Sequence, residues 1–192
     1  MDISQLISGN LGDSGILNQL GQSVGANPNQ VQQLMQLGLP TLTQALAQNA
    51  STPAGAQSLA NALDQHQDEP VDNLASFFQN VDTADGAKIL QHVFGGSTAQ
   101  VQSNLAQQTG LQTNQVSGLL AQLAPLLLGV LGKQKKEQHL DSSGVAGLLG
   151  SLMGQTGNSS AMTMATQMLD SNKNGSILDE IGGFLGRLFG KR

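Results

Sequence analysis

A short stretch near the C-terminus has the residue types and spacing of a calcium loop. Six residues there could offer oxygen ligands to a hard cation: Asp170, Asn172, Asn174, Ser176, Asp179 and Glu180. An EF-hand loop has ligands at its first, third, fifth and seventh positions, a glycine at the sixth and a bidentate glutamate at the twelfth. Counted from Asp170, the sixth position is Gly175 but the twelfth is Ile181, so a neighbouring carboxylate would have to substitute. The stretch therefore predicts a calcium site of weak affinity, on the order of 0.1–1 mM.

The same stretch also has a reading that needs no metal. Asn174 and Gly175 form a typical turn pair, and Ser176 with Asp179 is an acceptable capping pair for a following helix. Both readings stay open on the sequence alone. Calcium is the only cofactor that the sequence suggests.

Catalytic motifs are weak. Residues 21–25 match the Gly-x-Ser-x-Gly nucleophile string around Ser23, but that motif works on a strand-to-helix turn and this segment is helical in pattern. His66, His92 and His139 lack ligand spacing and are predicted to be surface or loop residues. Acid–base catalysis needs paired titratable groups, so the sequence predicts a protein that is not an enzyme.

Composition excludes several classes of function. The 192 residues carry a net charge of −5 with only eight Lys and Arg, which argues against nucleic-acid binding. There is no cysteine, and residues 1–20 show no signal-peptide pattern, which favours a cytoplasmic location. The longest apolar stretch, 119–131, is interrupted by Pro125 and is shorter than the ~20 residues of a membrane span.

The elements that would position any site are predicted to be helices throughout. Apolar residues recur at spacings of three and four, and no alternating β-branched stretch occurs. Asn27 and Pro28 read as a helix start, and Pro40 should kink or break the helix that follows. Residues 126–131 are apolar nearly all round, which is typical of a central helix.

One helical unit is written twice in the chain. Residues 18–48 align without a gap on residues 103–133 at a constant offset of 85. Ten aligned positions are identical, including the pairs Gly25/Gly110, Gln30/Gln115 and Pro40/Pro125. The prediction is an all-α, multi-helix array with an internal duplication and about ten short helices.

The predicted organisation has four parts. Residues 1–66 form a first helical half, 67–82 a linker and connecting helix, 83–169 a second half, and 170–192 the possible cation loop plus a C-terminal amphipathic helix. The acidic group at the linker is expected to be solvated: Asp64, Asp68, Glu69 and Asp72.

The C-terminal stripe allows three uses. Arg187, Lys191 and Arg192 lie near or beyond the end of this stripe. Its apolar residues recur at helical spacing: Ile177, Leu178, Ile181, Phe184, Leu185, Leu188 and Phe189. The stripe can pack on the bundle, bind a partner or a second copy, or lie on a membrane surface. Packing on the bundle is favoured, and a membrane is the least favoured of the three.

Three features together resemble a known family. They are the repeated Gly-x4-Gln-Val-x2-Leu unit, the Leu/Gly/Ser-rich segment 143–154 and the ending 169–183. They resemble the bacterial domain of unknown function 937, which is related to YidB-like proteins. The resemblance implies an all-helical bacterial protein and supplies no catalytic residues. The leading hypothesis is a non-enzymatic protein that self-associates or binds an unknown protein partner; the alternative is a weak calcium-binding module.

Overall fold

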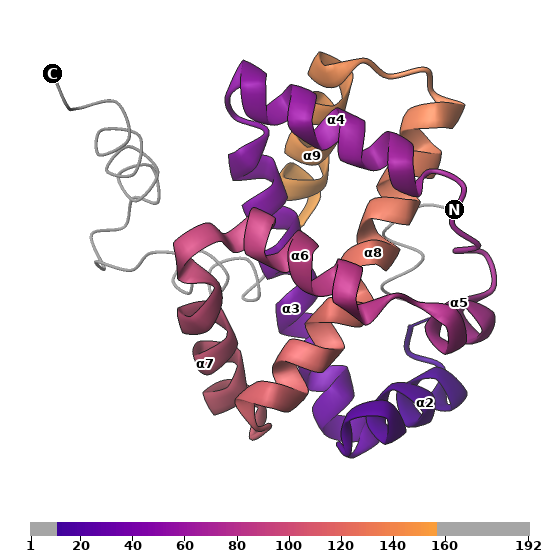
Figure 1. Cartoon of the computed structure of the whole chain (residues 1–192), viewed down its shortest axis with the longest axis vertical. Helices are drawn as coiled ribbons and strands as arrows, with labels where there is room; N and C mark the ends of the chain where they lie inside the picture. The colour runs from indigo at the N-terminus through magenta and orange to yellow at the C-terminus, as the bar shows by residue number, and fades with distance from the viewer. Residues whose placement is uncertain (1–10, 157–192) are drawn as a thin grey trace, which may run out of the picture.

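The computed structural model describes residues 11–156, with side chains to residue 152, and every statement about the structure concerns these residues. The elements are α2 (Ser14–Val24), α3 (Pro28–Asn49), α4 (Pro53–His66), α5 (Leu74–Asn80), α6 (Thr83–Phe94), the 3-10 turn η2 (Gly95–Ser97), α7 (Thr98–Thr109), α8 (Thr113–Glu137) and α9 (Ser142–Thr156) (Figure 1). No strand occurs between residues 11 and 156, which confirms the all-α prediction there. The C-terminal amphipathic helix expected within residues 170–192 lies outside the described residues.

Helix α8 is the centre of the bundle. Residues 119–132 of this helix are all buried, and α4 and α6 make their most extensive packing against it. One continuous apolar core runs from Leu11 to Leu149 and takes residues from both predicted halves. Within residues 11–156, α8 alone is long and apolar enough to cross a membrane, but 83% of its most apolar window is buried inside the protein. That burial is what a core helix requires.

Both helices that contain a proline continue past it as single elements. α3 spans 22 residues through Pro40, and α8 spans 25 residues through Pro125. Of the kink or break predicted at Pro40, the break does not occur. A proline inside a helix frees the carbonyl four residues earlier, here that of Gln36, and Gln36 is exposed to water. Packing of the long apolar face of α3 outweighs the one lost hydrogen bond.

The two aligned segments have the same order of elements. In each, a helix ends at a left-handed glycine and a capping box opens the next helix; φ is 70° at Gly25 and 67° at Gly110. The Gln30 side chain donates to the Gly110 carbonyl at 2.9 Å, and the Gln115 side chain donates to the Gly25 carbonyl at 2.7 Å. The two helix–glycine–helix units therefore contact each other reciprocally.

The connection after α4 is held more tightly than a solvated linker would be. Val71 is fully buried against the core. Three of the exposed aspartates in and beside this connection pair with the lysine run at the end of α8: Lys135–Asp64 at 2.5 Å, Lys136–Asp68 at 2.6 Å and Lys133–Asp72 at 2.5 Å. The Lys133 ammonium holds the pKa of Asp72 below its ordinary value, chiefly by hydrogen bonding, and Asp72 raises the pKa of Lys133 in the same way.

Candidate binding groove

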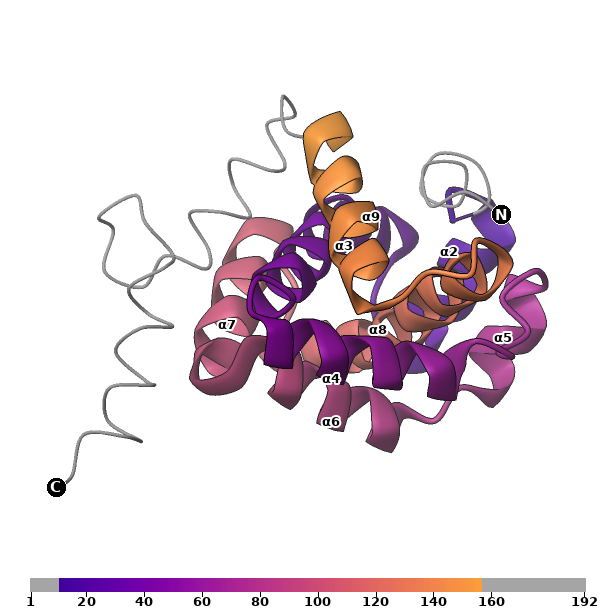
Figure 2. The same ribbon diagram turned by 90° about the horizontal axis from the view of Figure 1, so that it is seen from above.

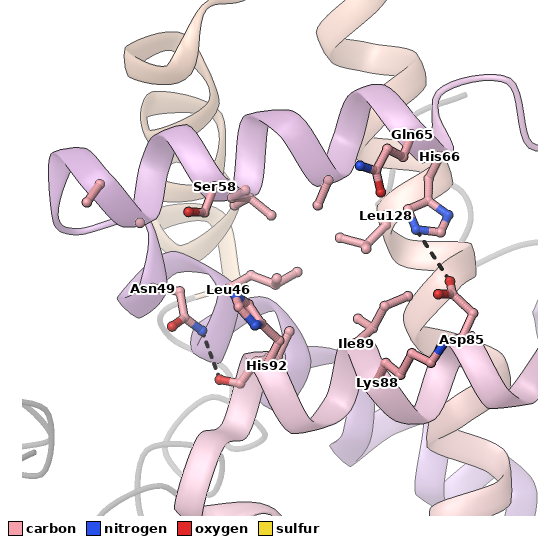
Figure 3. A pocket seen from close by; sticks show the side chains of 15 residues that line it. Leu46, Asn49, Ser58, Gln65, His66, Asp85, Lys88, Ile89, His92 and Leu128 are labelled. Atoms are coloured by element: carbon pink, nitrogen blue, oxygen red, sulfur yellow. Dashed lines mark hydrogen bonds and ion pairs between the residues drawn. The ribbon is translucent and has the colours of Figure 1, made fainter.

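A cavity of about 450 Å³ lies between α4 and α6. Both helices pack on α8, while their packing on each other is slight. The space between them is therefore walled by two helices and floored by α8 and the end of α3 (Figure 3). We call this cavity the α4–α6 groove.

The N-terminal caps of α4 and α6 determine where the two walls of the groove begin. Thr52 caps α4 by accepting a hydrogen bond from the Gly55 amide at 3.1 Å, and Pro53 occupies the first turn. Gly55 lies against the Asn49 carbonyl, where a Cβ would collide with backbone. Asp82 caps α6 by accepting from the amides of Ala84 and Asp85 at 2.8 and 3.1 Å. These caps fix where each wall begins.

One glycine lets α6 approach the central helix closely. A Cβ at Gly86 would collide with the Ala121 carbonyl of α8. Pro125 lacks the amide hydrogen that would otherwise bond that carbonyl within the helix. The freed Ala121 carbonyl thus faces the α6 backbone, and only a residue without a Cβ fits there.

The floor and lower walls of the groove are apolar. Leu46 and Leu128 are buried at the base, Leu59 is buried on the α4 side, and Ile89 and Val93 are half-buried on α6. A concave apolar floor with a few polar groups at its edge is the usual form of a ligand or peptide site. The arrangement suits an apolar side chain or ligand that arrives from solvent.

One end of the groove is bridged by a histidine. His66 at the end of α4 places Nε2 at 3.6 Å from the Asp85 carboxylate of α6 (Figure 3). Its Nδ1 lies 3.6 Å from the Glu69 carboxylate. The His66 side chain is only 13% exposed, whereas the two carboxylates are 37% and 41% exposed. This end is therefore acidic at the surface with an imidazole beneath it.

The other end is closed by an amide. Asn49, the last residue of α3, donates to the Val93 carbonyl of α6 at 2.8 Å and to the Ala45 carbonyl at 3.0 Å. Between the two ends, Lys88 and His92 line the groove and are exposed, and neither has a hydrogen-bond or ion-pair partner among residues 11–152. Their polar atoms are available to a bound molecule.

The six predicted calcium ligands, Asp170, Asn172, Asn174, Ser176, Asp179 and Glu180, lie outside the described residues. Within residues 11–156 no group of three His, Asp or Glu could hold a metal ion. Ser23 of the nucleophile string is on helix α2, where its hydroxyl donates to the Leu20 carbonyl at 2.8 Å and accepts from Gln122 at 3.0 Å. Its hydroxyl therefore serves a helix contact.

The sequence predicts that His66 and His92 are surface or loop residues and does not indicate the groove. A signal was present, because Asp85, Lys88 and His92 fall at helical spacing on the same face of α6 as Ile89. Six polar side chains then meet across one apolar floor: Ser58, Gln65 and His66 of α4, and Asp85, Lys88 and His92 of α6. The pairing of those two faces depends on the tertiary fold.

Comparison with known proteins identifies the family. No curated protein and no solved structure matches the chain. A family model described as a bacterial protein of unknown function, DUF937, matches residues 5–134. That range covers more than half of the chain, including α2 to α7, most of α8 and both walls of the groove. The chain therefore belongs to the bacterial DUF937 family.

Proposed function

We propose that this DUF937 protein is a non-enzymatic binding protein that receives an apolar protein segment in the α4–α6 groove. The observation that carries the proposal is the groove itself: two helix walls that pack on α8 and leave a cavity of about 450 Å³ with an apolar floor. An amphipathic helix that lays its apolar face into such a groove is a common mode of peptide recognition. The low surface charge of the chain also lowers the electrostatic barrier to association.

The side chains of the groove favour binding over catalysis. A nucleophilic enzyme needs a hydroxyl within hydrogen-bond reach of a base, which is in turn oriented by a third group. Ser58 is the only hydroxyl among the groove residues, and no hydrogen bond links it to His66 or His92. The acidic net charge argues against a nucleic-acid partner. We also propose that the protein is cytoplasmic.

Site-specific photo-crosslinking tests the proposal. A photoreactive residue at Ser58, which is exposed at the groove, should give a discrete adduct in the bacterial cell, identified by mass spectrometry. Ile89→Lys places a charge on the groove wall and should abolish that adduct. Gln91→Lys adds the same charge to an exposed position of the same helix outside the groove lining and should leave it. Absence of an adduct, or one that survives Ile89→Lys, would rule out the groove as a binding surface.

Calcium binding is the second candidate function, favoured by the Asp170–Ile181 spacing. Calcium that binds the native state raises the unfolding midpoint. Thermal unfolding with and without about 5 mM calcium, well above the expected dissociation constant, checks this. A rise that disappears in Asp170→Ala supports the site, and an unchanged midpoint leaves the stretch as a turn and cap.

We also infer that residues 18–48 and 103–133 descend from one duplicated helical unit. The constant offset of 85 supports this, and so does the reciprocal contact in which Gln30 and Gln115 each reach the glycine that ends the other unit's first helix. Separate expression of one unit tests it: residues 1–66 should form a symmetric dimer if the unit still carries the self-complementary surface. A monomeric, unfolded fragment would contradict the inference.

A further inference from the structure

We propose that the occupant of the α4–α6 groove is the C-terminal segment 177–189 of a second copy of this chain. This inference rests on the proposed function of the groove. Each copy has one groove and one segment, and the smallest closed assembly that fills both grooves is a reciprocal dimer with two-fold symmetry. We assign that dimer here.

The segment has the pattern that the groove requires. Ile177, Ile181, Leu185 and Leu188 recur every three or four residues, so one face of a helix over 177–189 would be apolar. Thirteen helical residues span about 20 Å, and the 12-residue wall α6 spans about 18 Å. The segment and the groove wall therefore match in length.

Charge favours this occupant over an acidic one. Residues 1–156 contain ten acidic and four basic residues, a net charge of −6, whereas residues 157–192 contain three and four, a net charge of +1. Arg187 lies near the end of the segment and Lys191 and Arg192 follow it, whereas the two carboxylates Asp179 and Glu180 lie near its start. The His66 end of the groove presents Glu69 and Asp85, both more than a third exposed. Basic residues at one end of the segment complement these carboxylates.

The direction in which α9 runs favours a second copy over the same chain. α4 and α6 form one face of the molecule, and α9 starts behind α4 and ends on the opposite side (Figures 1 and 2). To reach the groove of its own copy, the segment would need residues 157–176 to pass around the molecule. A domain of this size has a radius of gyration of about 15 Å, which corresponds to a sphere of radius about 19 Å and a half circumference of about 60 Å.

The length of the connection decides between the two routes. Twenty residues reach at most about 70 Å when fully extended, and a flexible chain of that length has an end-to-end distance of about 25 Å. Docking into the groove of the same copy therefore demands a nearly taut chain, which costs much of its conformational entropy. A neighbouring copy can instead present its groove close to the end of α9.

Disulfide trapping in the full chain tests the proposal. The chain has no cysteine, so any disulfide reports only introduced residues. Ser58→Cys on one copy and Phe184→Cys or Leu188→Cys on another, mixed under mild oxidation, should give a disulfide-linked dimer of the two variants. Ala99→Cys, exposed on α7, is the matched control and should give none with the same partners. Circular dichroism of each variant checks that it remains folded.

The other outcomes are decisive too. If Ser58→Cys and Phe184→Cys in one chain join within a single copy at high dilution, the second-copy assignment is wrong. If photo-crosslinking at Ser58 captures a different protein and no disulfide dimer forms, the occupant is wrong while the groove's function stands. If neither experiment gives a product, both the groove and its occupant are refuted.

Discussion

Gln30 and Gln115 each make the same two contacts, one within their own helical unit and one to the other unit. Each closes the capping box of its own helix through its side-chain oxygen: Gln115 Oε1 accepts from the Gln112 amide at 2.9 Å, and Gln30 Oε1 accepts from the Asn27 amide at 3.4 Å. Each then donates through its side-chain nitrogen to the glycine carbonyl of the other unit, at 2.7 and 2.9 Å. Each glutamine side-chain amide thus stabilises both the start of its own helix and the contact between the two units.

Replacing Gln115 with glutamate should separate these two roles. Glutamate keeps the acceptor for the capping box and suits the helix N-terminus by about 0.3–1 kcal/mol. It loses the donor and sets a carboxylate beside the carbonyl oxygens of Val24 and Gly25, at a cost of about 1–3 kcal/mol. We expect a net loss of about 1 kcal/mol in the free energy of unfolding, measured by urea denaturation.

The control is Gln36→Glu, which makes the same exchange on the exposed face of α3 and should change stability by less than about 0.5 kcal/mol. If Gln115→Glu is as stable as that control, the contact between the units contributes nothing.

Gly86→Ala should be among the most damaging single-methyl changes in the protein. The added Cβ would collide with the Ala121 carbonyl, a backbone atom of the central helix that cannot move aside. α6 would have to separate from α8, and overpacking of this kind costs about 2–3 kcal/mol. Gly96→Ala, where a Cβ meets nothing within 4 Å, should stay within about 0.5 kcal/mol. Thermal unfolding of the two variants measures this difference. Equal unfolding midpoints would contradict the close approach of α6 to α8.

Leu128→Ala should cost less than the same change deeper in α8. Leu128 forms part of the groove floor, so the space left behind joins an open cavity that water can enter. We expect a loss of about 2–3 kcal/mol for Leu128→Ala and about 3–5 kcal/mol for Leu123→Ala, which is fully enclosed. Denaturant unfolding measures both. A larger loss at Leu128 would mean that the groove is closed to solvent.

The Asp72–Lys133 pair should make a small contribution to stability that depends on pH. The pKa of Asp72 is lowered in the folded state, so its contribution is present above the pKa of the unfolded chain and is lost as the pH falls through the folded-state pKa. The pKa of Lys133 is raised, so its contribution is present below the unfolded pKa and is lost as the pH rises through the folded one. Both groups are on the surface, and salt should weaken the pair.

Asp72→Asn tests this. The variant should be slightly less stable than the natural chain near pH 7 and indistinguishable from it near pH 2, where Asp72 is protonated in both states. About 1 M NaCl should also remove the difference. A difference that persists at acid pH would assign the effect to something other than the ion pair.

The amino-acid sequence by itself determined the helices and their starts, because these depend on neighbours along the chain. Spacings of three and four predict the all-α class, and α3 begins at the predicted Asn27–Pro28 start. The unbroken passage of α3 through Pro40 was not predictable, because it depends on long-range packing that one lost hydrogen bond does not outweigh.

Only the tertiary structure decided which faces meet. His66 and Asp85 are 19 positions apart and on different helices, and no pattern along the chain pairs them. They face each other because α4 and α6 both pack on α8, where Gly86 sets how closely α6 approaches the Ala121 carbonyl. The groove, with Leu128 as its floor, is the space left between two helices that share a support. Such a space is a property of three helices in contact, so periodicity within any one of them does not reveal it.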